Sequence, residues 1–157
     1  MELESASLKI SANPIDTLVT NKDGHIVQDS KGERLIKTRT FAELAVKHRS
    51  SDKLLNSLLN SYDTAVRNPN RELVHLYEIR DALSKQYSGE SGAREQLGIT
   101  SQQWKRLGQL CNDEPLRQGR HGGRMGKDLR DATQEELAEA RDIGRSMIEA
   151  YLHTLKN

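Results

Sequence analysis

The spacing of apolar residues changes near residue 40 of the chain. Before it, apolar positions fall in the short runs S-L-K-I-S, T-L-V-T, H-I-V-Q and R-L-I-K-T, which are separated by turn residues. Such runs are typical of β-strands. Between two of them stands Asp23-Gly24, and glycine there suits the positive φ of a tight hairpin. The pattern predicts an antiparallel β-meander of roughly three or four strands within residues 1–39.

Beyond residue 40 the apolar residues recur at helical spacing. Thr40 and Glu43 form a capping box, which satisfies free backbone amides where a helix starts. Two strongly amphipathic segments follow, at residues 51–66 and 72–87. Pro69 lies between them and cannot continue the helical hydrogen bonding, so we expect two antiparallel neighbouring helices.

In the remainder of the chain, the apolar spacing predicts shorter helices and one long closing helix. Residues 90–97 and 101–112 have helical spacing and are joined at a turn glycine. A second capping box begins at Thr133 and opens the last helix. The predicted fold is therefore α+β and mostly α. A small β-meander at 1–39 packs on a bundle of about five helices at 40–157.

Charge is balanced over the whole chain but not locally. The net charge is +1, so no overall field attracts the protein to nucleic acid. Residues 117–130 hold five Lys or Arg against one Asp, whereas residues 131–142 hold five Asp or Glu against one Arg. Any contact with nucleic acid must therefore come from the local basic segment, and the acidic segment beside it can neutralise part of its charge.

The sequence favours a reduced, cytoplasmic protein with no bound metal or cofactor. Cys111 is the only cysteine, so it forms no internal disulfide and supplies no zinc framework. The amino terminus, M-E-L-E-S-A-S, lacks the basic and apolar regions of a signal peptide. No apolar run approaches the roughly 18 residues that span a membrane. We therefore expect no contact with a membrane.

The basic segment R-Q-G-R-H-G-G-R-M-G-K carries the candidate chemistry. It has four glycines between residues 119 and 126, which let backbone amides approach an anion. Arg120, Arg124 and Lys127 are the predicted contacts to phosphate or nucleic acid, because their side chains bind phosphate oxygens well. The plain alternative is a basic loop that pairs with the acidic start of the last helix.

Four features of residues 51–155 point to a known superfamily. They are a helical pair containing L-V-H-L-Y-E-I-R-D-A-L, a short segment L-G-I-T-S-Q-Q-W-K-R-L-G-Q-L, the Arg/His cluster R-Q-G-R-H-G-G, and a closing helix E-E-L-A-E-A-R-D-I-G-R-S-M-I-E-A-Y-L. In these features the chain resembles the HEPN superfamily, small α-helical domains common in prokaryotic toxins and defence systems. The resemblance covers about two-thirds of the chain and leaves out the N-terminal strands.

The resemblance implies an RNA-directed function in a prokaryotic or phage defence system. The RNase motif of the superfamily is an arginine followed by a histidine with four to six residues between. Arg117 and His121 have three residues between them, one fewer than the motif, and are the catalytic pair that the resemblance implies. In active members two such motifs meet across a homodimer interface. There the histidine transfers protons and the arginine steadies the phosphate, without a metal. Other members are inactive folds that only bind.

Two alternative functions stay open beside the RNA-directed function. One is a non-catalytic adaptor or inhibitor that binds a protein partner, with the N-terminal strands as its docking face. The other is a DNA-binding regulator. A-R-E-Q-L-G-I-T-S-Q-Q-W-K-R-L looks like a helix-turn-helix unit in which Lys105 and Arg106 contact DNA. Arg94, four residues before the turn glycine, is larger than the residue such units usually place there.

Overall fold

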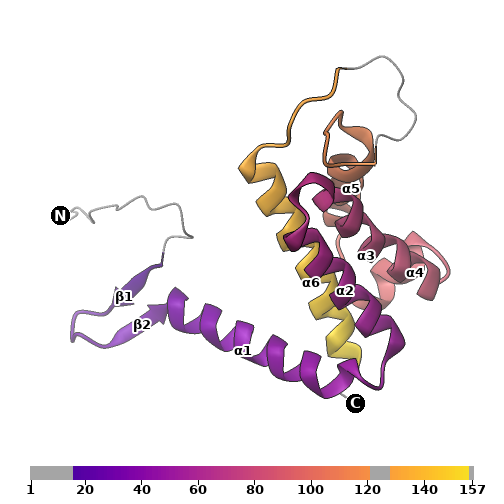
Figure 1. Cartoon of the computed structure of the whole chain (residues 1–157). Coiled ribbons are helices and arrows are strands. Elements are labelled where there is room, and N and C mark those ends of the chain that lie inside the picture. Colours follow the sequence, from indigo (N-terminus) through magenta and orange to yellow (C-terminus); the bar gives the residue numbers. More distant parts are fainter. Residues whose placement is uncertain (1–15, 121–127, 156–157) are drawn as a thin grey trace. The chain divides into compact units, whose positions relative to one another are not determined.

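Figure 1 shows the computed structural model of the chain, which describes residues 16–120 and 128–155. The described residues fall into two compact units, divided between Glu43 and Leu44. Helices dominate, and the only sheet among the described residues is a two-stranded one near the amino terminus. The predicted mostly helical α+β fold is confirmed.

The N-terminal unit begins with the predicted hairpin. Strand β1 (Leu18–Thr20) pairs antiparallel with β2 (Ile26–Asp29). Gly24 in the turn has a φ of 79°, the left-handed region in which glycine carries no side-chain penalty. The Asn21 side chain accepts hydrogen bonds from the backbone amides of Asp23, at 3.0 Å, and His25, at 2.9 Å. The runs T-L-V-T and H-I-V-Q are thus strands, as predicted, and S-L-K-I-S lies outside the described residues.

The last run of the expected meander is helical instead. R-L-I-K-T, residues 34–38, lies within helix α1 (Ser30–Arg49), so its prediction as a strand was wrong. The Asp29 carboxylate accepts a hydrogen bond from the backbone amide of Gly32 at 2.9 Å and caps the helix directly after β2. Thr40 and Glu43 therefore lie inside a helix rather than at its start. Glu43 pairs with Arg39 one turn before it, at 2.8 Å.

The second unit consists of helices and two short helical turns. They are α2 (Lys53–Arg67), η1 (Pro69–Arg71), α3 (Glu72–Gln86), α4 (Glu90–Leu97), α5 (Ser101–Gly108), η2 (Gln109–Asp113) and α6 (Gln134–Thr154). The helices α2, α3 and α6 run side by side in Figure 1, and all three pack on one another. Turn η2 is a π-helical turn that continues α5 without a break.

An aliphatic core holds this helical unit together. Its largest fully buried side chains come from α2, α3, α5, η2 and α6 and from the segment after η2; they are Leu55, Leu58, Leu73, Leu76, Ile79, Leu83, Trp104, Leu107, Leu110, Leu116, Met147 and Ile148. Each large side chain of this kind stabilises the fold by about 1.5–3 kcal/mol through removal of apolar surface from water. Gly144 lets α6 approach α3, since a β-carbon there would lie 3.2 Å from the Leu76 side chain.

Polar contacts fix how α6 sits against its neighbours. The Tyr151 hydroxyl donates to the Asp52 carboxylate at 3.0 Å, and the same carboxylate caps α2 through the Leu55 amide at 2.7 Å. Glu72, at the start of α3, is 2% exposed and forms an ion pair with Arg141 on α6. A buried carboxylate is tolerated only with such a partner, so this pair fixes the start of α3 relative to α6.

None of the helices in the described part of the chain is both long enough and apolar enough to cross a membrane.

Candidate functional site

The two ends of the basic segment are tied together by the backbone. The Arg117 amide donates to the Arg130 carbonyl and the Arg130 amide donates to the Pro115 carbonyl, each at 3.0 Å. These bonds form a parallel bridge between Leu116 and Arg130, and Leu116 is fully buried. The described residues on both sides of 121–127 are therefore anchored to the helical unit.

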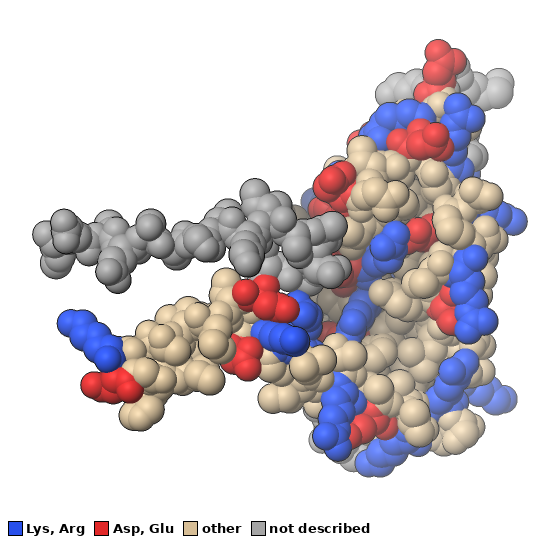
Figure 2. Space-filling view, turned by 60° about the vertical axis from the view of Figure 1, so that its left-hand side comes forward, with Lys and Arg blue, Asp and Glu red and all other residues tan. Residues whose placement is uncertain are grey.

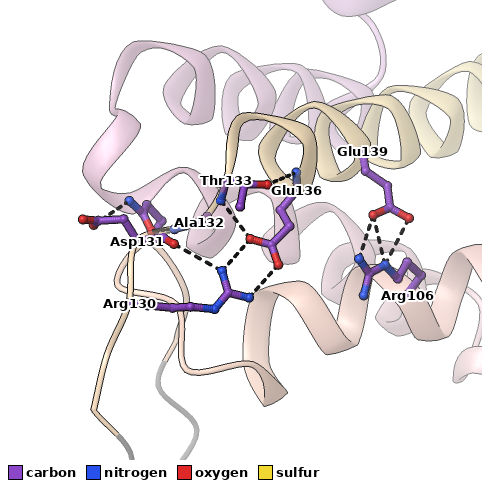
Figure 3. A network of polar contacts seen from close by, with 8 residues as sticks. Arg106, Arg130, Asp131, Ala132, Thr133, Glu136 and Glu139 are labelled. Carbon is purple, nitrogen blue, oxygen red and sulfur yellow. Dashed lines mark hydrogen bonds and ion pairs between the residues drawn. The ribbon is translucent and has the colours of Figure 1, made fainter.

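Figure 3 shows how the acidic start of α6 holds one side of this bridge. The Arg130 guanidinium donates to both Glu136 oxygens, at 2.7 and 2.8 Å. Glu136 also accepts from the Thr133 amide at 2.8 Å, which confirms the predicted capping box. Hydrogen bonding from Arg130 lowers the pKa of Glu136 to about 2, although partial burial opposes the shift. The acidic segment thus neutralises Arg130, which lies at the end of the basic segment.

The other side of the bridge is pinned against α3 and η2. The Gln118 carbonyl accepts from the Val74 amide at 3.3 Å, and its side-chain oxygen accepts from the Ala132 amide at 3.0 Å. The Arg120 amide donates to the Cys111 carbonyl at 2.8 Å. Gly119 is required for this approach, because a β-carbon there would lie 2.9 Å from the Cys111 carbonyl oxygen.

The pinned backbone brings three arginines to one cavity. A cavity of about 350 Å³ is lined by Arg71, Val74, Arg117, Gly119 and Arg120. Arg71 comes from the turn before α3, and the other two arginines come from the basic segment. All three arginines are exposed. Arg117 lies 3.7 Å from Asp131, whereas Arg71 and Arg120 form no ion pair with any other residue in the described ranges. Positive charge is therefore concentrated at this cavity.

Tyr77 on α3 lies beside this cavity and is contacted by two guanidiniums. The Arg120 guanidinium lies over its ring at 4.5 Å. Arg80 donates to the Tyr77 hydroxyl at 2.8 Å and stacks over the Trp104 ring at 5.0 Å. Such cation–π contacts orient a guanidinium without neutralising its charge. Arg120 is therefore oriented by an aromatic ring and keeps its hydrogen-bond donors for an anion.

Cys111 lies behind these arginines as a buried thiol. It is fully buried, and desolvation raises its pKa to about 12 although Arg80 and Arg120 act in the opposite direction. Only the thiolate is a good nucleophile or metal ligand, so this side chain acts as a small apolar core residue. Within residues 16–120 and 128–155, no group of three or more His, Cys, Asp or Glu side chains is placed to hold a metal ion.

The structure describes only some of the site residues that were predicted in the basic segment. Arg117 and Arg120 line the same cavity, whereas His121, Arg124 and Lys127 lie outside the described residues. Figure 2 shows basic and acidic side chains interspersed over the face in view, consistent with the near-zero net charge.

Lys105 and Arg106, the predicted DNA contacts, are in different surroundings. Arg106 donates to both Glu139 oxygens at 2.8–3.0 Å and joins α5 to α6 (Figure 3). Lys105 is exposed and lines a second cavity with Tyr77 and Arg80. Contact with DNA through Arg106 would require this ion pair to break, and the prediction otherwise stays untested.

Two residues of the site were missed from the sequence. Arg71 follows the Asn-Pro-Asn break between two helices, where no spacing pattern distinguishes it from a solvated arginine. Tyr77 falls on the apolar stripe of the segment 72–87, a position that indicates a core residue, although its side chain is only partly buried. The only feature of Arg71 in the sequence is its position at a helix start, and an arginine at a helix start does not by itself indicate a ligand site.

No protein-family model matches the chain, and neither a curated protein nor a solved structure matches it significantly. The resemblance to the HEPN superfamily therefore stays a prediction that rests on the residues quoted above.

Proposed function

We propose that the chain is a HEPN-like protein of a prokaryotic or phage defence system, which binds RNA through the cavity of Arg71, Arg117 and Arg120. The observation that carries the proposal is the convergence of these three guanidiniums, from two segments far apart in the sequence, on one cavity. Like charges repel one another, so their collection at one place is a cost that an anionic ligand removes.

A phosphate group fits the chemistry of this cavity. Guanidinium groups donate in a planar fork that matches phosphate oxygens, and each such contact is stronger than a neutral hydrogen bond. The exposed side chains of Arg71 and Arg120 are free of ion pairs within the described ranges. They need not break a protein contact to bind. RNA is proposed over other phosphates because of the HEPN resemblance.

Cleavage without a metal is the catalytic form of this proposal. His121 directly follows Arg120, whose backbone is held at the cavity. By the superfamily resemblance, the His121 imidazole would accept the proton of the RNA 2′-hydroxyl as that oxygen bonds to the adjacent phosphorus. The bond from phosphorus to the 5′-oxygen would break as the 5′-oxygen takes up a proton, while Arg117 or Arg120 would stabilise charge on the attacked phosphate. By the superfamily resemblance, we expect this form to need a homodimer that brings two clusters together.

Fluorescence anisotropy with labelled single-stranded RNA tests the binding. A hydrogen bond to a charged group contributes about 1.5–3 kcal/mol, so we expect the Arg71→Ala/Arg117→Ala/Arg120→Ala variant to bind at least about tenfold more weakly. Its salt dependence should also fall, by about 0.7 in the slope of log K against log salt, because the three arginines hold one phosphate and each phosphate contact on a single strand contributes about 0.7. Arg39→Ala removes an exposed arginine of the N-terminal unit and serves as the control. Equal binding by the triple variant and the control would refute the proposed site.

Incubation of the protein with mixed RNA in EDTA, followed by a gel, tests cleavage. We expect the wild type to cleave and the His121→Ala variant to leave the RNA intact while it retains its helical circular dichroism and its RNA binding. No cleavage by the wild type, with binding intact, would reject the enzyme and leave an RNA-binding protein.

A second candidate function is supported by the N-terminal unit. Its hairpin and helix expose large apolar side chains, among them Leu18 at 61%, Val27 at 66% and Ile36 at 67% exposure. A two-stranded hairpin is marginally stable by itself, so burial of these side chains by a protein partner would stabilise it. This is the adaptor alternative. A partner that co-purifies with the wild type and is lost from a Val27→Lys/Ile36→Lys variant would support it.

A further inference from the structure

A polar face of α5 and η2 lies beside the arginine cavity. Lys105, Gly108, Gln109, Asn112 and Asp113 recur at helical spacing, on the side opposite the buried Trp104, Leu107 and Cys111. The helix closes in a π-turn, in which the Glu114 amide donates to the Gln109 carbonyl at 2.9 Å. Such turns are rare and occur frequently at functional sites.

This face is one wall of a second cavity. The cavity has a volume of about 310 Å³, and Tyr77 and Arg80 of α3 form its other wall. Within the described ranges, the side chains of Gln109, Asn112 and Asp113 form no hydrogen bond. The volume is at the lower end of small-ligand pockets, about 300–1,000 Å³.

Asp113 is placed at an unfavourable end of its helix. It is the last residue of η2, where the helix dipole presents its negative end, and a carboxylate there is disfavoured. No basic residue lies in this last turn to compensate. The Asp113 carboxylate is exposed and forms no ion pair or hydrogen bond with another residue in the described ranges, so a ligand with hydrogen-bond donors can bind it without displacing a protein partner.

One contact joins the linings of the two cavities. Tyr77 lines the second cavity, and Arg120, which lines the first, lies over the Tyr77 ring at 4.5 Å. A phosphate and a base of one nucleotide are joined through a single sugar, so one nucleotide can place these two groups in adjacent cavities. In this arrangement the arginines would bind the phosphate and the polar face would bind the base.

We propose that the second cavity binds a guanine base of the RNA whose phosphate lies at Arg71, Arg117 and Arg120. This inference rests on the proposed function. Guanine carries adjacent donors at N1 and N2, which one carboxylate, that of Asp113, accepts together. It also carries acceptors at O6 and N7, to which the Lys105 ammonium donates. Adenine, cytosine and uracil lack the adjacent pair of donors, and a carboxylate facing their acceptors would repel them.

Isothermal titration with 5′-GMP, 5′-AMP and 5′-XMP (the xanthine nucleotide) tests the base cavity. We expect the wild type to bind 5′-GMP about tenfold more tightly than 5′-AMP, as a bidentate contact to one base usually discriminates. Asp113→Asn keeps the side-chain size and replaces one acceptor by a donor. It should therefore lose the preference for guanine and gain one for xanthine, which has an oxygen where guanine has its 2-amino group. Asp63→Asn, an exposed carboxylate of α2, is the matched control and should behave as the wild type.

A second measurement separates this inference from RNA binding itself. Anisotropy is recorded with a short oligouridine RNA that carries one guanosine or, in its place, one adenosine. Tighter binding of the guanosine RNA by the wild type and equal binding of both by Asp113→Asn support the base cavity. RNA binding without any preference, together with equal affinities for 5′-GMP and 5′-AMP, overturns the base cavity and leaves the proposed function standing. A preference for 5′-GMP without RNA binding keeps the base cavity and rejects the proposed function, and no binding in either assay rejects both.

Discussion

The ion pair between Glu72 and Arg141 offers the sharpest test of how the helical unit is held together. Replacement of Arg141 by methionine keeps most of the side-chain volume and removes the charge. Glu72, at 2% exposure, would then be a buried carboxylate without its partner. Because Glu72 begins α3 directly after Arg71, the change also disturbs one wall of the arginine cavity.

The expected loss follows from the burial of the two partners. Removal of one member of a buried ion pair costs about 3–5 kcal/mol, because the other charge is left uncompensated. The Arg141 side chain is 36% exposed, so water can reach the site and reduce the loss. We therefore expect about 3 kcal/mol, the lower end of the range, which lowers the melting temperature by roughly 10 °C.

Urea unfolding followed by circular dichroism measures this loss. Arg67→Met is the control, because Arg67 pairs with Asp63 on the surface and its side chain is 77% exposed. That change should cost less than about 1 kcal/mol. The double variant Glu72→Met/Arg141→Met removes both charges and should regain most of the stability lost by Arg141→Met. A loss from Arg141→Met no larger than that of the control would refute the reasoning, and so would a double variant less stable than Arg141→Met.

Three further predictions concern the surroundings of the cavity. Gly119→Ala should reduce stability by about 1–3 kcal/mol in urea unfolding and weaken RNA binding, because its β-carbon would press on the Cys111 carbonyl 2.9 Å away. Since the pKa of Glu136 is lowered to about 2 in the folded protein, its contribution is present at neutral pH. It is lost as the pH falls from about 4.3, the ordinary glutamate pKa, towards 2, and Glu136→Gln should flatten the stability profile in that window. Cys111 should not react with a thiol reagent at pH 8 in the native protein and should react on unfolding, since burial raises its pKa to about 12.

Local sequence determined most of the secondary structure. The amphipathic stripes of α2 and α3, the hairpin glycine at residue 24 and the capping box at Thr133 were all read from neighbouring residues. Each depends on contacts within a few positions, so no knowledge of the fold was needed. The strand prediction for residues 34–38 was wrong because a short apolar run fits either a strand or a helix. The capping contact from Asp29 favours the helix.

The candidate site was only half determined by the sequence. Local charge and glycine content identified the basic segment with Arg117 and Arg120. Only the tertiary structure added Arg71, the Tyr77 ring and the polar face of η2, because these lie on separate elements that the core packing brings together. It also assigned Arg130 to an ion pair with Glu136 rather than to a ligand. Periodicity and capping are short-range properties and can be read along the chain. A cavity depends on distances between remote segments, which the burial of apolar side chains sets.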